Sequence, residues 1–130
     1  MKFDKSKKLL VIGRAGMDIY PEPPGTKISD VQEFSTHLGG SAANTCVALS
    51  KLGVSSDLVT CISDDAIGEY IFKKLEDFNI GSNLCRRVDK NFQTQVAVVE
   101  TILKNNQSIL YRNNSCDLQL DKEDIDKINF

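Results

Sequence analysis

Two adjacent glycines lead into a run of small residues whose spacing could bind a ligand. Gly39 and Gly40 precede Ser41-Ala-Ala-Asn44, and Gly53 follows the apolar stretch, so the pattern predicts a helix that begins at Ser41. Glycines let the backbone approach a ligand closely, and a helix N-terminus offers unpaired amides that suit an anion such as phosphate. The glycine pair also fits a turn needed only for tight packing. The phosphate-binding patterns GxxxxGK[ST] and GxGxxG are both missing from the sequence.

Asp18 is a second residue that could contact a ligand. It follows a short apolar segment, 9–13, which predicts a parallel strand that ends in glycine. Proteins of the α/β class bind ligands at the carboxyl ends of such strands, and a carboxylate there can accept hydrogen bonds from two sugar hydroxyls. Taken alone, Asp18 also fits a loop cap.

The elements that must position these residues alternate between strands and helices. We expect strands over the following segments: 8–13, 31–38, 57–62, 94–101 and 107–112. We expect helices that begin at Ser41, near Ser63 or Asp64, and at Asp121, and a proline-rich loop over 21–25. This order predicts an α/β fold with right-handed crossovers.

Composition and charge exclude several classes of function. The 130 residues suit one domain, and 41% of them are hydrophobic, which is enough for a core. The net charge is −2, and the only basic run, Lys5 to Lys8, is interpreted as a solvated terminus. We therefore expect neither a nucleic-acid nor a membrane partner. The apolar stretch 9–13 is too short for a signal peptide or a membrane span, so we expect the cytoplasm.

The cysteines are interpreted as reduced and mostly buried thiols. They are widely and irregularly spaced, at Cys46, Cys61, Cys85 and Cys116, and His37 is the only histidine in the sequence. This pattern matches no metal-ligand spacing, so we expect no metal site. A structural or exposed role is expected for His37, and packing is expected for Tyr20.

Several motifs in this order resemble the ribokinase (PfkB) family of carbohydrate kinases. They are Gly13-Arg-Ala-Gly-Met-Asp18, Gly39-Gly-Ser-Ala-Ala-Asn44, the later Gly53, and Asp64-Asp-Ala-Ile-Gly68. The resemblance covers nearly the whole chain and implies a three-layer αβα sheet, present in part, with a small β-strand lid. We expect the core over about 8–13 and 39–81 and the lid over about 17–38 and 83–112. The resemblance further implies a sugar-binding set, which consists of Asp18, Gly39, Gly40, Ser41 and Asn44.

A further likeness concerns the substrate. Gly13-Arg-Ala-Gly-Met-Asp-Ile-Tyr-Pro-Glu22 and Leu110-Tyr-Arg-Asn-Asn114 resemble the 5-dehydro-2-deoxygluconokinase branch of the family, which phosphorylates a sugar acid in inositol breakdown. Arginine binds a carboxylate through two parallel hydrogen bonds, so Arg112 fits such a substrate. The alternative for Arg112 is an ion pair with Asp117. Arg14 is a further candidate anion contact, or a partner for an acidic neighbour.

The resemblance also implies what lies outside this sequence. Members of the family carry a Gly-Ala-Gly-Asp segment whose amides stabilise the transferring phosphoryl group and whose aspartate deprotonates the acceptor hydroxyl. No such segment occurs here, so we expect neither catalytic nor ATP-binding residues in this chain. ATP and Mg²⁺ are implied for the complete enzyme, as is a homodimer through lid strands. The alternatives are a non-catalytic sugar-binding or assembly protein, or a ribose, nucleoside or 2-keto-3-deoxygluconate kinase.

Overall fold

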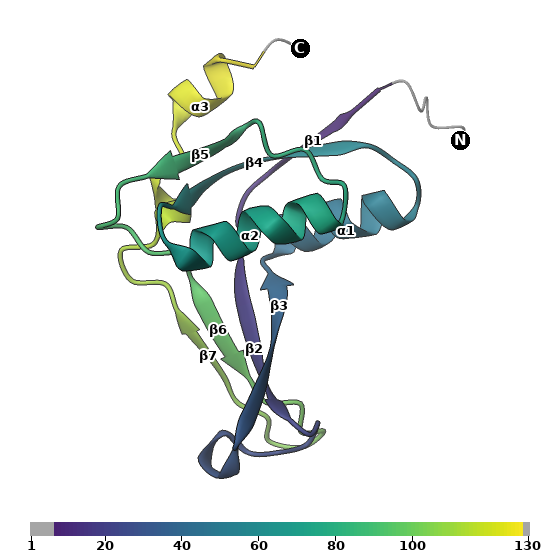
Figure 1. Cartoon of the computed structure of the whole chain (residues 1–130), viewed down its shortest axis with the longest axis vertical. Helices are drawn as coiled ribbons and strands as arrows, with labels where there is room; N and C mark the ends of the chain where they lie inside the picture. Colours follow the sequence, from purple (N-terminus) through teal and green to yellow (C-terminus); the bar gives the residue numbers. More distant parts are fainter. Residues whose placement is uncertain (1–6, 129–130) are drawn as a thin grey trace.

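A computed structural model describes residues 7–128 of the chain, which form two sheets and five helical segments (Figure 1). The strands are β1 (Leu9–Ile12), β2 (Gly16–Glu22), β3 (Glu33–Gly39), β4 (Ser56–Ser63), β5 (Cys85–Val88), β6 (Val96–Val99) and β7 (Ser108–Tyr111). The α-helices are α1 (Ser41–Lys51), α2 (Ala66–Asp77) and α3 (Lys122–Asp126), and the 3-10 helices are η1 (Ile28–Asp30) and η2 (Cys116–Gln119). None of the helices within residues 7–128 is long and apolar enough to cross a membrane.

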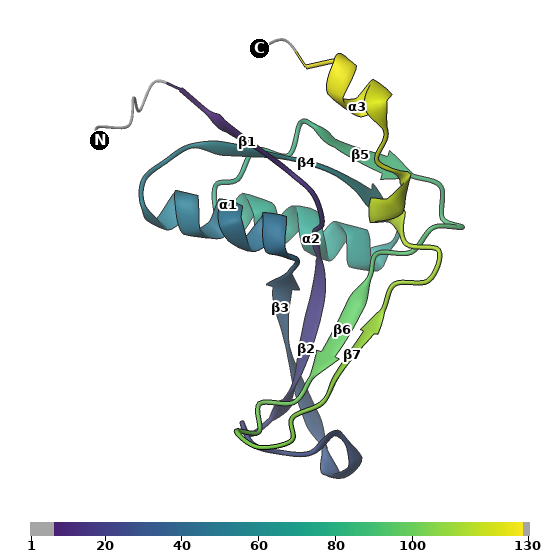
Figure 2. The ribbon, with the colours of Figure 1, turned by 180° about the vertical axis from the view of Figure 1, so that it is seen from behind.

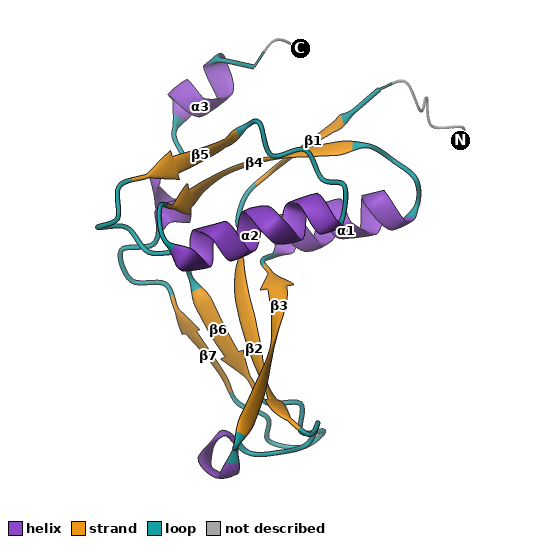
Figure 3. Cartoon of the chain, viewed as in Figure 1, coloured by secondary structure: helices purple, strands orange, loops and turns teal. Residues whose placement is uncertain are grey.

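The first sheet, which we call the core sheet, has the strand order β1-β4-β5 and is entirely parallel. Helices α1 and α2 lie along one of its faces (Figure 3). The side chains of Leu58 and Ile62 point from β4 towards these helices and are fully buried with Ile71 and Leu75 of α2. Alternation along a strand places Val59 and Cys61 on the opposite face.

The opposite face of the core sheet is covered by the C-terminal part of the described chain. Cys61 of β4 packs there with Val88 and with Cys116 of η2. The Arg86 guanidinium of β5 donates two hydrogen bonds to the Asp124 carboxylate, with Nε–Oδ1 and Nη2–Oδ2 distances of 2.6 and 2.8 Å. Helices therefore lie on both faces of a parallel sheet, as expected for an α/β fold of three layers.

The second sheet, which we call the outer sheet, has the order β3-β2-β6-β7 and extends away from the core sheet and its helices (Figure 2). The chain passes from β1 into β2 through Gly13 to Ala15, and β3 runs directly into α1. Residues that pair across the outer sheet form rows, and one row contains His37, Asp18, Ala97 and Leu110. The outer sheet thereby brings polar side chains to the N-terminus of α1.

Two parts of the predicted arrangement were wrong. Residues 21 and 22 belong to β2, where they pair with β3, and not to a loop. A proline is tolerated at position 21 because β2 pairs with β6 only over Met17 to Ile19, so no backbone amide is needed on that side. The segment Cys85–Val88, expected in the lid, pairs with β4 as strand β5 of the core sheet. Two adjacent arginines interrupt the apolar pattern of this strand in the sequence. In the folded chain each has acidic partners: Arg86 pairs with Asp124, and Arg87 with Asp64 and Glu69.

Candidate functional site

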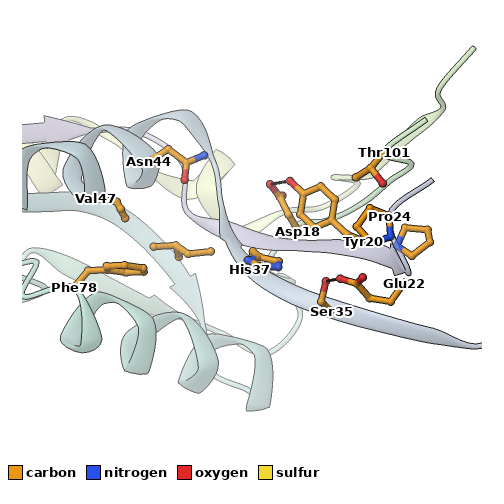
Figure 4. A pocket seen from close by; sticks show the side chains of 12 residues that line it. Asp18, Tyr20, Glu22, Pro24, Ser35, His37, Asn44, Val47, Phe78 and Thr101 are labelled. Carbon is orange, nitrogen blue, oxygen red and sulfur yellow. Dashed lines mark hydrogen bonds between the residues drawn. The ribbon is translucent and has the colours of Figure 1, made fainter. Parts of the chain in front are cut away.

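A pocket of about 500 Å³ lies where the outer sheet meets α1 and α2. Its lining comes from β2, β3 and α1, with Pro24, Phe78 and Thr101 added from the segments that follow β2, α2 and β6. The lining residues are Asp18, Tyr20, Pro21, Glu22, Pro24, Ser35, His37, Leu38, Asn44, Val47, Phe78 and Thr101. Figure 4 shows Glu22 and Ser35 at one end of the pocket, Val47 and Phe78 at the other, and Asp18, His37 and Asn44 between them.

Asp18 is held in place by its neighbours on the outer sheet. It lies on β2 opposite His37 of β3, and the Tyr20 hydroxyl donates a hydrogen bond to its Oδ2 atom over 3.4 Å. Gly39 is the other close neighbour, because a Cβ at position 39 would lie 2.0 Å from Asp18 Oδ1. The glycine therefore leaves the space that the carboxylate occupies.

Gly40 brings the helix that carries Asn44 close to the first strand connection. Its φ of +97° is one that residues with a side chain rarely adopt, and a Cβ there would lie 2.4 Å from the carbonyl oxygen of Arg14. The amide of Ala43 donates to that carbonyl over 3.3 Å. One of the four N-terminal amides of α1 is thus already bonded within the protein. The glycine pair places Asp18 and Asn44 at one pocket, whereas Ser41 is exposed and does not line it.

Sequence reasoning missed several polar residues of the pocket. Tyr20 and His37 meet edge to face, with ring centroids 5.3 Å apart, and the Ser35 hydroxyl donates to Glu22 Oε1 over 2.6 Å. The signal that could have found them is alternation. Polar side chains recur at every second position in two segments, at 18, 20 and 22 and at 33, 35 and 37, as expected for two paired strands with one polar face.

The pocket is acidic. Asp18 and Glu22 contribute carboxylates, and none of the described lining residues is Lys or Arg. Burial raises the pKa of the Tyr20 phenol, and the negative charge of Asp18 raises it further, so Tyr20 remains a hydrogen-bond donor at neutral pH. Carboxylate, amide, imidazole and hydroxyl groups around a partly apolar cavity can hold a polyhydroxylated molecule through its hydroxyls.

Comparison with known proteins decides the family. The pfkB family carbohydrate kinases match this chain over residues 6–129. The chain belongs to the pfkB family. It is 36% identical over 125 residues to the 5-dehydro-2-deoxygluconokinase of Photobacterium profundum, a match that covers 95% of this chain and 37% of that protein.

Solved structures of sugar kinases share the fold. The uncharacterized sugar kinase of Pyrococcus horikoshii has a TM-score of 0.80 at 26% identity, over 91% of this chain and 38% of that one. The fructokinase of Xylella fastidiosa, solved with bound ATP, has a TM-score of 0.78 at 24% identity, over 91% of this chain and 37% of that one. These likenesses confirm the predicted α/β fold. This pfkB chain spans only 37–38% of the length of these three proteins.

The two arginines predicted to contact an anion do not line the pocket of this pfkB chain. Arg112 Nη2 and Nε donate to Asp117 Oδ2 over 2.6 and 3.0 Å, and the Asp117 side chain is only 4% exposed. The Asp117 carboxylate raises the pKa of Arg112. Arg14 contributes its carbonyl oxygen to the entry of α1, and within residues 7–128 its side chain forms no ion pair. The ion pair that was the alternative for Arg112 is therefore present.

The cysteines behave as expected from the sequence. All four are free, and three are buried, whereas Cys85 is half-buried. Burial raises the pKa of Cys61 to about 11 and that of Cys85 to about 12, so both are protonated at neutral pH. Within residues 7–128, no three His, Cys, Asp or Glu side chains are grouped so that they could hold a metal ion.

Proposed function

We propose that this chain is the substrate-binding part of a sugar kinase that transfers the γ-phosphate of ATP to a primary hydroxyl of a sugar acid, 5-dehydro-2-deoxygluconate. The observation that carries the proposal is the convergence of Asp18 and Asn44 on one pocket, through the Gly39-Gly40 entry of α1. The likeness to the Photobacterium profundum kinase supports the choice of substrate. We further propose a cytoplasmic location, which is consistent with a kinase of the pfkB family.

The pocket side chains can each make a different contact with a sugar. The Asp18 carboxylate accepts hydrogen bonds from one or two hydroxyls, each strengthened by its charge. Asn44 can donate and accept through its amide, and Tyr20 fixes one of the two Asp18 oxygens. Val47 and Phe78 offer apolar surface to the carbon chain. Such fixed contacts orient the acceptor hydroxyl, and orientation is a main contribution of protein to phosphoryl transfer.

We propose no contact between the residues of this chain and ATP or Mg²⁺. The sequence lacks the phosphate-binding patterns and the Gly-Ala-Gly-Asp segment, and no metal-binding group exists among residues 7–128. The Xylella fastidiosa fructokinase binds ATP, which supports ATP as the phosphoryl donor in the proposed reaction. We assign no catalytic residue and no nucleotide contact to this chain.

Arg112 is proposed to bind the carboxylate of the sugar acid. Leu110 shares a row of the outer sheet with Asp18, two strands away, which corresponds to about 10 Å. Arg112 follows Leu110 by two residues and does not line the pocket, but its guanidinium already binds a carboxylate, that of Asp117. Binding of a sugar acid there requires Arg112 to share or exchange this partner. Ribose, nucleoside and 2-keto-3-deoxygluconate kinases remain the alternatives.

Activity is tested with a fusion to the part of a relative that this chain does not span. Residues 1–130 are joined to the part of the Photobacterium profundum kinase that this chain does not match, and ATP-dependent phosphorylation is measured. The substrates are 5-dehydro-2-deoxygluconate, 2-keto-3-deoxygluconate, ribose and adenosine. We expect the first to be preferred by kcat/KM. Turnover of ribose or adenosine alone would contradict the sugar-acid assignment, and the same fusion with Asp18→Asn serves as the control for the site.

A second candidate function rests on the same pocket: a protein that binds sugar or mediates assembly without catalysis. One assay separates this function from that of a kinase. Phosphorylation of any sugar by the 130-residue chain in the presence of ATP and Mg²⁺ excludes it.

We further propose a homodimer formed through the outer sheet. On the face opposite Asp18, β3 presents Phe34, and β7 presents Ile109 and Tyr111, which are 45%, 39% and 62% exposed. Aromatic and aliphatic side chains exposed together on one face of a sheet favour association with a matching surface.

A further inference from the structure

The second carboxylate of the pocket lies away from the residues to which a role has been assigned. Glu22 is four residues beyond Asp18 on β2, a distance of about 13 Å along the strand. It lines the same pocket, at the end where Figure 4 shows Ser35 and Pro24. Ser35 donates to one of its oxygens, so the carboxylate is held in a fixed position. A carbon chain held at Asp18 can extend towards Glu22 or away from it.

A neighbouring carboxylate adds to the negative potential at the Glu22 end of the pocket. Glu33 of β3 pairs directly with Glu22 across the strands, and like charges in this position repel each other and destabilise the pair. Among the described residues, no Lys or Arg lines the pocket, and no ion pair neutralises Glu22. The fold therefore maintains uncompensated negative charge at one end of a cavity.

We infer that Glu22 determines the orientation of an anionic sugar in this pocket: it rejects the carboxylate end, so that only the hydroxyl end of the ligand lies beside it. This inference rests on the proposed binding of a sugar acid. A neutral sugar experiences no such repulsion. A ligand with a carboxylate at each end cannot avoid Glu22 in either orientation, so it should be excluded more strongly than a ligand with one.

Three open-chain six-carbon ligands that differ only at their ends test the inference. They are glucitol, gluconate and glucarate, with no, one and two carboxylates. Binding to the 130-residue chain is measured by calorimetry for wild type, Glu22→Gln and Glu33→Gln. Glutamine keeps the size of the side chain and can still accept the Ser35 hydrogen bond. Glu33→Gln is the matched control, because it removes the same charge and the same cross-strand repulsion from a residue that does not line the pocket.

We expect Glu22→Gln to tighten glucarate binding by about three- to tenfold, the effect of one repulsive pair near a protein surface. The affinity for gluconate should rise by at most about twofold. Gluconate already has one favourable orientation in wild type, and a second equivalent orientation can only double its binding constant. Glucitol should not change. In wild type, added salt should raise glucarate affinity relative to gluconate, because salt screens the repulsion.

The contrary outcomes are distinct. Equal changes for all three ligands would show Glu22 to be an ordinary hydroxyl contact, and unchanged glucarate binding would remove its role; either result overturns this inference alone. The inference is also overturned if Glu33→Gln changes glucarate affinity as much as Glu22→Gln does. The effect would then come from the overall negative charge of the protein and not from the position of Glu22. If wild type binds none of the three ligands, the proposed function fails and this inference fails with it.

Discussion

Gly39 and Asp18 lie so close together that a Cβ at position 39 would be 2.0 Å from Asp18 Oδ1. Real Cβ atoms do not approach an oxygen this closely, so a side chain at 39 must displace the carboxylate. This contact links the glycine entry of α1 to the position of the hydroxyl-binding group. Gly39 therefore leaves room for the Asp18 carboxylate, a role that requires no phosphate bound at the N-terminus of α1.

We therefore predict that Gly39→Ala weakens sugar binding by about tenfold or more, because the displaced Asp18 loses charge-assisted hydrogen bonds. The substitution should also lower the free energy of unfolding by about 1–3 kcal/mol through overpacking. Gly25→Ala is the control: its φ of +93° adds backbone strain, but no atom lies within 4 Å of the new Cβ. Calorimetry and thermal unfolding measure both effects, and unchanged binding in Gly39→Ala would contradict the link.

A second prediction concerns Tyr20 and pH. Burial and the Asp18 charge raise the pKa of Tyr20, so Asp18→Asn should lower it. The folded protein keeps this proton where the unfolded chain has lost it, so the free energy of unfolding should decline as pH rises above about 10. Asp18→Asn should weaken that decline. Ultraviolet titration in a Tyr70→Phe, Tyr111→Phe background isolates Tyr20, and an equal shift in Asp30→Asn would show the effect to be non-specific.

The third prediction separates the two roles of Arg112. If it binds the substrate carboxylate, Arg112→Gln should weaken gluconate binding by about tenfold and leave glucitol binding unchanged. The substitution alone leaves the buried Asp117 without its partner and can destabilise the chain. The double variant Arg112→Gln, Asp117→Asn removes this complication. Equal binding of gluconate by wild type and the double variant would leave Arg112 a structural residue.

The elements that were predicted correctly are those whose pattern is local. The apolar run of β1 and the small-residue helix α1 between glycines are each specified by neighbouring residues. Strand β5 was missed because Arg86 and Arg87 break the apolar pattern, and both find acidic partners only in the folded chain. Strand β2 was missed because Pro21 indicated a loop, although its position beyond the β6 pairing tolerates proline.

Among the residues of the candidate site, those marked by a local motif could also be predicted from the sequence. Asp18 and Asn44 could be proposed from their order in the chain, because each stands beside a glycine motif. Glu22 and His37 were missed, because alternation marks only a polar face and the register of β2 with β3 is needed to bring them to the pocket. The partner of Arg112 was an open choice in the sequence, since nothing local distinguishes Asp117 from a substrate carboxylate.

The fourth prediction tests association through the outer sheet. Phe34→Asp or Ile109→Asp should convert a dimer to a monomer, because each places a charge in the apolar face on which both residues lie. Leu52→Asp is the matched control, since Leu52 is 76% exposed at the end of α1, away from that face. Light scattering with size-exclusion chromatography measures the mass. A wild-type monomer, or equal dissociation of the Leu52 variant, would contradict the proposed interface.

The last prediction concerns the ion pair that fastens α3 to the core sheet. Arg86 lowers the pKa of Asp124 to about 2, chiefly through its hydrogen bonds, and the Asp124 side chain is only 7% exposed. A carboxyl with a lowered folded-state pKa adds stability above its unfolded pKa, near 4, and loses it as pH falls towards 2.

Asp124→Asn should therefore lower the free energy of unfolding by about 1 kcal/mol at pH 7, a value reduced for solvent around the half-exposed Arg86. The difference from wild type should shrink as pH falls from about 4 towards about 2, because the wild-type carboxylate then becomes protonated. Asp126→Asn is the control, because its pair with Lys122 is exposed on both sides and should contribute little. Denaturant unfolding across this pH range measures the difference. A gap that stays constant with pH would show that the ionised form of Asp124 adds no stability, and it would contradict this prediction.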